Sequence, residues 1–448
     1  MSLKQLVKRL VLGAEPEPAI SDNPFPPQEL PVARTPRDTL SQQTRQAILH
    51  RDEIIDRRGR IAGYRFYVRP AGNAPLAGNA FVDALKSEAV ANLARRRSAL
   101  LPITVEEWHS GAFAQFVAAG SIFLLDCPRE VPPPAAWSEA VAAIQAAGAK
   151  VALRDPPSTA AAEAALPSAQ MLLLDFNAYD LPRFERILRG LRQRFPDLQI
   201  AVDNVADWAE RRLCVAIGAD GCLGGFASLP DEEEKQDQID QSRLVLIEML
   251  NLLRKDADFA DIAAVAKRDP GVSVYVIGMA NSPMAGLAKP VASLDQAIMV
   301  LGREFLYRWL TISLFRVGSR KDRDETLLEL ALARARLLEL LGQPQRPKAE
   351  CEELFLVGLL SVMDALLGQP MDQVLARMTL PAAVKDVLLR SAGPYGRFLM
   401  LALALEKGRS EQAGKLAESL NIAVVTLEQA SLSALAWAEE AMQFSRTG

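Results

Sequence analysis

The sequence predicts an α/β barrel followed by an all-helical domain, with a short tethered helix in front of the barrel. Up to about residue 230, short apolar segments alternate with helical patterns, whereas beyond it apolar residues recur at helical spacing. The 448 residues are also too many for one ordinary domain. Half of them are hydrophobic, so each domain has enough apolar side chains to bury a core.

The first 13 residues predict an amphipathic helix. Its apolar stripe contains Leu3, Leu6, Val7 and Leu10, and cationic residues lie on the other side. Residues 14–44 are rich in proline and predict an extended tether. A helix on a tether can dock onto a partner protein, onto a membrane surface or back onto its own domain, and the sequence leaves these alternatives open.

Residues 45–230 predict a barrel of parallel strands covered by helices. The strand candidates read IAGYRFYV, SIFLL, KVAL, QMLLL and LQIAV. Their alternation with helical segments is typical of a compact βα barrel, in which chemistry lies at the carboxyl ends of the strands.

Residues 231–241 form an acidic run that predicts a solvated hinge or the start of a helix. From residue 242 to 436, Leu and Ala stripes at helical spacing are interrupted by Gly and Pro. This half of the chain is therefore predicted to be an all-helical domain with a dense apolar core.

Composition narrows the classes of partner. The formal net charge is −4, from 51 basic and 55 acidic residues, which gives no whole-chain reason to expect nucleic-acid binding. The four cysteines lack the spacing of a zinc site or a disulfide framework. No apolar run approaches the roughly 20 residues that span a bilayer, so we expect a cytoplasmic protein without a membrane span.

Several segments of the barrel region resemble the EAL domain, a barrel that hydrolyses cyclic di-GMP in bacteria. They read RQAILHRDEIIDRRGRIAGYRFYVR, VALRD, LLLDF and IGADGCLGGF. The likeness is closest to the variant in which an EAL-type barrel is joined to an HDOD domain. It implies a two-domain bacterial signalling protein.

An active EAL phosphodiesterase uses carboxylates and an amide to hold two divalent cations, which activate water and neutralise charge on the phosphate. Five positions of this sequence depart from the family pattern. Arg65 stands in place of a glutamate ligand and Arg154 in place of an aspartate ligand. Leu173, Ala206 and Leu223 replace the catalytic lysine, a glutamate and the closing glutamine. The resemblance therefore implies a degenerate barrel that is not an enzyme and holds no metal.

Arg65 has two other interpretations. It can be a solvated arginine at the rim of the barrel, or it can bind an anion together with Arg69. These alternatives stay open on the sequence alone.

A residual nucleotide site is a separate alternative. Its candidate residues are Arg69, Asp126, Asp155, Asp175 and Asp203, although a one-residue shift would put Leu125 in place of Asp126. The aspartates can equally serve as caps at strand ends and turns. If they converge, the barrel is a cyclic di-GMP receptor, or a weak phosphodiesterase that uses Mg²⁺.

The helical half resembles the HDOD domain in AKRDPGVSVYVIGMANSPMAG and PVASLDQAIMVLGREFLYRWL. HDOD domains are related to metal-dependent HD phosphohydrolases but lack their metal site. Here Ser361 and Val362 stand where those enzymes have a His-Asp pair. Because His50 and His109 are the only histidines, this half cannot contain a metal site made largely of histidine.

Taken together, these features predict a non-catalytic signalling adaptor that needs no cofactor. We expect it to contact a protein partner through the HDOD domain and the N-terminal helix. EAL barrels often dimerise, so a homodimer is also expected. The resemblance connects the chain with motility, surface attachment and pilus control, without naming a partner.

Overall fold

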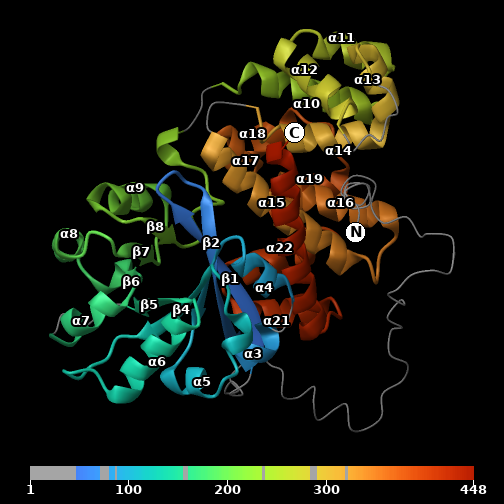
Figure 1. Ribbon diagram of the computed structural model, residues 1–448. Coiled ribbons are helices and arrows are strands. Elements are labelled where there is room, and N and C mark those ends of the chain that lie inside the picture. The colour runs from blue at the N-terminus through green and yellow to red at the C-terminus, as the bar shows by residue number, and fades with distance from the viewer. Residues whose placement is uncertain are drawn as a thin grey trace, which may run out of the picture.

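The computed structural model describes residues 47–70, 80–85, 88–154, 160–234, 238–282, 290–317 and 321–447. An eight-stranded closed barrel lies on one side, and a helical half packs beside it (Figure 1). The predicted combination of a barrel with an all-helical domain is confirmed. The predicted helix at residues 1–13, including Leu3, Leu6, Val7 and Leu10, and the tether at residues 14–44 lie outside the described residues.

The barrel strands follow one another in sequence order, and β8 closes onto β1. Their bounds are β1 Ala47–Asp56, β2 Ile61–Pro70, β3 Ser98–Pro102, β4 Ser121–Asp126, β5 Lys150–Arg154, β6 Met171–Asp175, β7 Gln199–Asp203 and β8 Gly221–Leu223.

One strand departs from the prediction of a barrel of parallel strands, because β1 is antiparallel to both β2 and β8. The reason is the short turn between β1 and β2, since so short a connection can join only antiparallel strands. In this turn Asp56 Oδ1 accepts hydrogen bonds from the backbone N–H groups of Arg58 and Arg60, both at 2.9 Å. Gly59 adopts a positive φ of 90°, which favours glycine.

The inside of the barrel is apolar. Alternating residues of the strands point inward and form one buried cluster, which contains Ile54, Leu100, Ile122, Leu124, Ala152, Met171, Leu173, Ala201 and Leu223. Leu173 and Leu223 therefore pack in the interior, at positions where the EAL resemblance places polar catalytic groups.

Helices cover the outside of the barrel. Their bounds are α3 Ala80–Leu85, α4 Glu88–Ala94, α5 Val105–His109, α6 Ala135–Ala146, α7 Ala160–Ala165, α8 Leu181–Arg194 and α9 Trp208–Ile217. Aspartates fix the starts of α8 and α9: the Asp180 side chain accepts from Arg183 N–H, and the Asp207 side chain accepts from Glu210 N–H.

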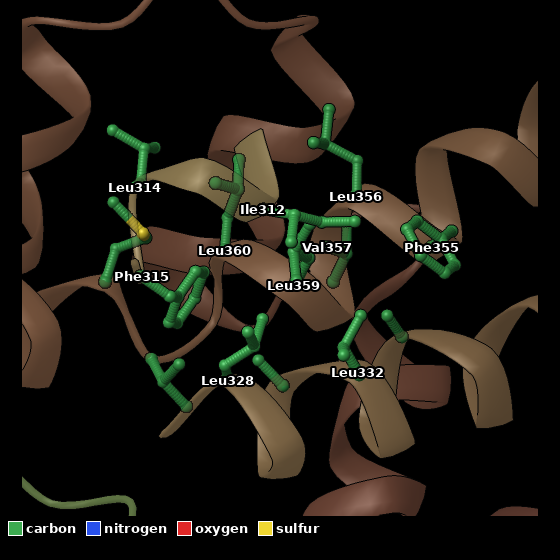
Figure 2. Close-up of a cluster of buried hydrophobic side chains, with 14 of the residues drawn as sticks. Ile312, Leu314, Phe315, Leu328, Leu332, Phe355, Leu356, Val357, Leu359 and Leu360 are labelled. Carbon is green, nitrogen blue, oxygen red and sulfur yellow. The ribbon is translucent and has the colours of Figure 1, made fainter. Parts of the chain in front are cut away.

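The helical half begins after the acidic run. Its helices are α10 Gln241–Arg254, α11 Phe259–Ala266, α12 Pro270–Ala280, α13 Leu294–Leu301, α14 Arg303–Ser313, α15 Lys321–Gly342, α16 Lys348–Leu360, α17 Met363–Leu367, α18 Met371–Ala376, α19 Ala382–Arg390, α20 Gly396–Glu406, α21 Ser410–Ser419 and α22 Val424–Thr447. Apolar side chains of α15 and α16 face one another in its core (Figure 2). At their crossing, a Cβ atom on Gly358 would lie 2.4 Å from the Cα of Ala335, so the close approach requires glycine.

The two halves share a packed interface. Helix α22 lies along β1 and α4, and α21 contacts β1 and β2 (Figure 1). Within the interface Arg97 of the barrel donates to both carboxylate oxygens of Glu329 in α15, at 2.8 and 3.0 Å. Tyr64 Oη donates to the same carboxylate at 2.6 Å.

Most described residues of the acidic run are exposed, but its first residue is buried. Asp231 is buried, and its carboxylate accepts a hydrogen bond from Arg212 at 2.7 Å. A buried, paired carboxylate fixes this end of the connection, because breaking the pair would leave a charge without a partner. Residues 235–237 lie outside the described part of the chain.

Within the described residues, no single helix is both long and apolar enough to cross a membrane. One bent pair of helices, Ser410–Ser419 with Val424–Met442, is long and apolar enough when its two members are taken together.

Candidate functional site

Most of the predicted site residues lie at one end of the barrel. Strands β2 to β8 all finish at the same end of the barrel. We call this end the mouth. Because β1 is antiparallel, with Ala47 opposite Pro70, the first residues of β1 also lie at the mouth. Side chains alternate between the two faces of a strand, which places Asp52, Arg65 and Asp203 on the inward face, just beyond the apolar interior.

Arg65 forms the centre of the mouth. Its Nε and Nη2 donate to Oδ2 of Asp52, at 2.9 and 2.5 Å. Its Nη1 contacts Oδ2 of Asp203, and its Nη2 donates to Oδ1 of Asp203 at 3.0 Å. Only 15% of the Arg65 side chain is exposed, so the interpretation of Arg65 as a solvated rim residue is wrong.

Electrostatics keep this arginine charged. Burial alone would lower the pKa of Arg65, but the adjacent carboxylates of Asp52 and Asp203 outweigh burial and raise it. The planar guanidinium is therefore a fixed positive charge held between two carboxylates. Anion binding by Arg65 would have to compete with both of them.

The other predicted aspartates in the described residues have polar partners other than Arg65. Asp175 lies opposite Asp203 in the β6–β7 register, where its Oδ1 accepts from the side-chain amide of Asn204 at 2.9 Å. Asp126 is exposed and lies 3.6 Å from the guanidinium of Arg154. Asp155 lies outside the described residues.

The family's two-metal chemistry can be tested against this arrangement. In the described part of the chain, no group of three or more His, Cys, Asp or Glu side chains is placed to hold a metal ion. Two of the carboxylates that resemblance would assign to metal binding are engaged elsewhere, Asp203 with Arg65 and Asp126 with Arg154. The described residues therefore do not fit a pair of divalent cations.

Arg69 connects the mouth with the helical half. Its Nη1 donates to the backbone carbonyl of Gly408, in the turn between α20 and α21, at 3.1 Å. The ring of Tyr67 lies between Arg65 and Arg69, whose guanidinium carbons are 5.4 and 5.1 Å from its centroid. Tyr67 Oη donates to Asp52 Oδ1 at 3.3 Å, so Asp52 belongs to both contacts.

A second contact to the same turn comes from β1. His50 is buried, with Nδ1 2.9 Å from the carbonyl of Leu405 and Nε2 2.6 Å from Oγ of Ser410. Burial lowers the pKa of His50, which favours the neutral imidazole in this contact. His50, Asp52 and Tyr67 were not predicted as part of the site, because their partners are more than 300 residues away or on the neighbouring strand.

The helical half contains a comparable arginine at the place where resemblance locates a lost metal site. Arg334 donates to Oγ of Ser361 at 2.6 Å and to both carboxylate oxygens of Glu406, at 2.8 and 2.6 Å. Only 2% of Arg334 is exposed. Asp364, one helical turn on from Ser361, is partly buried, and burial raises its pKa.

Comparisons with known proteins agree with this architecture. Residues 243–379 match the model of the HDOD domain. The helical half contains an HDOD domain. The chain therefore combines an eight-stranded closed barrel with an HDOD domain.

Two curated relatives are similar to the chain. Cyclic di-GMP phosphodiesterase CdgJ of Vibrio cholerae is 24% identical over 303 residues, which are 67% of this chain and 70% of CdgJ. The uncharacterised protein YuxH of Bacillus subtilis is 27% identical over 177 residues, or 39% of this chain, and the match spans 43% of YuxH. Both relatives are bacterial.

Solved structures similar to the barrel are EAL domains. The EAL domain protein of Listeria monocytogenes is 16% identical, with a TM-score of 0.32, and the match covers 43% of this chain and 92% of that one. The EAL domain of Mycobacterium smegmatis DcpA is 20% identical, with a TM-score of 0.32, and the match covers 40% and 90% of the two chains.

One prediction from the sequence has to be corrected. The expectation that the chain is not an enzyme is contradicted by CdgJ, since a relative matched over two thirds of this chain is named a phosphodiesterase. Together the comparisons show an HDOD domain in the helical half and similarity to a relative named a cyclic di-GMP phosphodiesterase.

Proposed function

We propose that this chain works in cyclic di-GMP signalling by making protein contacts through its HDOD half, and that the barrel mouth regulates those contacts. The observation that carries the proposal is the hydrogen bond from Arg69, at the mouth, to Gly408 in the turn between α20 and α21. A ligand that takes the Nη1 donor of Arg69 competes with this carbonyl, so its arrival would change the contact that the helical half makes with the barrel.

The contacts on both sides of this hydrogen bond support the proposal. Arg65, Tyr67 and Asp52 form one chain of ion pairs and hydrogen bonds that begins at Asp203. His50 fixes the turn from the other side. A ligand that displaces one member of this chain therefore acts on a connected, partly buried network, which is the kind of element through which coupling can pass.

A surface for a partner protein is available on the HDOD half. Val274 of α12 and Met299 and Val300 of α13 are exposed by 70%, 66% and 45%. The two helices pack against each other and lie far from the barrel (Figure 1). We propose that these exposed apolar side chains on two packed helices form the contact surface.

The regulatory part is tested by calorimetric titration of cyclic di-GMP into the full-length chain with Mg²⁺ present, followed by hydrogen exchange with and without the nucleotide. We expect binding together with altered exchange in the segment 405–412. Binding that changes exchange only within the barrel would refute the coupling. Absence of binding would remove the nucleotide from the proposal and leave the protein contacts to be tested alone.

The contact surface is tested by the double substitution Val274→Glu and Met299→Glu. The altered full-length chain should lose co-purification of a partner that the unaltered chain retains. A matched control carries Val131→Glu, at an exposed residue of the barrel (58%). Equal retention of the partner by both variants would place the contact elsewhere. Light scattering of the same samples tests the predicted homodimer.

Hydrolysis of cyclic di-GMP is a second candidate function, favoured by the name of the Vibrio cholerae relative. The contents of the calorimeter cell can be analysed for the linear dinucleotide product. Product that disappears in an Asp203→Asn variant would support a phosphodiesterase that works at the mouth. Bound nucleotide without product would support a receptor.

A further inference from the structure

The HDOD half contains a cavity whose lining residues, among those that the structure describes, all belong to this half. It has a volume of about 300 Å³ and lies between the end of α10, helix α14 and helix α16. Its apolar floor is formed by Leu253, Phe355, Leu356 and Leu359. Three of these belong to α16 and are members of the buried cluster in Figure 2, so a rigid core supports the floor. A volume of this size is at the lower end of the range for small-molecule sites.

Arginines with unused donors line the same cavity. Nη2 of Arg308 is buried without a hydrogen-bond partner, and the nearest carboxylate oxygen, on Glu352, is 3.6 Å away. Nη1 of Arg303 is also buried without a hydrogen bond, although Nη2 of the same residue donates to the carbonyl of Ala257 at 2.6 Å. Donors on a charged group are costly to leave unsatisfied, so this arrangement favours a ligand with acceptor oxygens.

The guanidinium of Arg308 is held in a defined orientation. Its central carbon lies 5.4 Å from the centroid of the Phe355 ring, and 13% of its side chain is exposed. Beside it, the ring of Tyr307 lies 5.5 Å from the guanidinium of Arg254. Burial raises the pKa of Tyr307 to about 12, so this phenol remains neutral. The cavity thus presents aromatic faces next to planar cations.

Four carboxylates, on Asp256, Glu304, Glu352 and Glu353, line the cavity beside the three arginines, and those of Asp256 and Glu304 are exposed. Glu353 accepts a hydrogen bond from Tyr395 at 2.9 Å, which directs one oxygen to another partner. Asp256 is 88% exposed, so water screens its charge. Glu352 is the carboxylate nearest to the unused donors of Arg308, and it is shared with Lys348 at 3.8 Å.

We infer that this cavity binds a small phosphorylated molecule that carries an aromatic ring or base. The phosphate oxygens accept from Arg308 and Arg303, and the ring packs on the apolar floor beside Tyr307. Phosphate is favoured because a planar guanidinium donates to two of its oxygens at once. The site is separate from the barrel mouth, so it does not depend on whether the mouth binds cyclic di-GMP.

The test compares three probes on the full-length chain by calorimetry and ligand-observed NMR: phenyl phosphate, inorganic phosphate and benzyl alcohol. We expect phenyl phosphate to bind at least about tenfold more tightly than either of the others, because it alone uses both the cations and the floor. Absence of phenyl phosphate binding at about 10 mM would overturn the inference.

Two variants connect any binding to this cavity. Arg308→Met should weaken phenyl phosphate binding by about tenfold or more. Glu352→Gln removes the competing carboxylate and should strengthen binding severalfold, a gain that misfolding cannot produce. Arg189→Met, at an exposed ion pair on α8, is the control and should change nothing. If Arg308→Met and Glu352→Gln both bind phenyl phosphate as tightly as the unaltered chain does, the probe binds elsewhere and the inference is overturned.

Discussion

Replacing Arg65 tests whether the mouth is held together by its ion pairs. In Arg65→Met, the carboxylates of Asp52 and Asp203 lose their shared partner and face each other. Removing one partner of a buried ion pair costs about 3–5 kcal/mol. The exposed fractions of the three side chains are 15%, 15% and 16%, so we expect the lower end, about 3 kcal/mol of unfolding free energy.

The measurement is urea unfolding of the full-length chain, monitored by circular dichroism. The dependence of the unfolding free energy on urea concentration should be the same for the variant and the unaltered chain. The matched control is Arg189→Met, which removes an arginine paired with Glu185 where the side chains are 65% and 41% exposed. That substitution should cost less than about 0.5 kcal/mol.

A second variant separates the unpaired charges from lost packing. Adding Asp203→Asn to Arg65→Met removes one of the two facing charges and should restore part of the lost stability. The reasoning fails if Arg65→Met and Arg189→Met destabilise equally, or if the second substitution lowers stability further.

Three other substitutions follow from buried contacts. Burial raises the pKa of Glu53 to about 7, so the contribution of this residue to stability is complete below about pH 4.5 and is lost as the pH rises through 7. In urea titrations, the unfolding free energy of Glu53→Gln should match that of the unaltered chain at pH 4 and exceed it by about 3 kcal/mol at pH 8. Arg334→Met should cost about 3–5 kcal/mol by the same measurement, because it leaves the Glu406 carboxylate without its partner, and a loss below about 1 kcal/mol would contradict this. Gly408→Ala should lower the melting temperature, because the φ of Gly408 is +61° and a Cβ atom there would lie 2.6 Å from Tyr67 Oη. Adding Tyr67→Phe removes this hydroxyl and should recover the part of the loss that the clash causes. If the melting temperature does not recover, backbone strain accounts for the whole loss.

The sequence predicted the barrel from strands that are buried on both faces. β4, β5, β6 and β7 are nearly continuous apolar runs and were identified within one residue of their ends. β1 was not identified, because AILHRDEIID has four charged or polar residues at its centre. Their partners lie on β2 and in the helical half, and neither can be recognised before the fold is known.

The contact between Asp52 and Arg65 shows why the site was only partly predictable. Counting outward from the turn between β1 and β2 pairs Ile55 with Ile61 and would place Asp52 opposite Tyr64. A register shift between Ile54 and Ile55 moves the pairing by one residue and brings Arg65 opposite Asp52 instead. A bulge of this kind leaves no clear mark in one sequence, so the sequence predicted an unusual arginine but not its partner.

Arg65 and Arg334 are both connected to the turn between α20 and α21. Glu406, the partner of Arg334, is the last residue of α20, and Gly408, the partner of Arg69, lies two residues later. Arg65 is joined to that turn through Tyr67, whose Oη lies close to Gly408. If this turn transmits energy between the halves, the effects of Arg65→Met and Arg334→Met on unfolding free energy should not add. A coupling above about 0.5 kcal/mol in the double-mutant cycle would support transmission through the turn, whereas additive losses would mean that the two centres stabilise their halves independently.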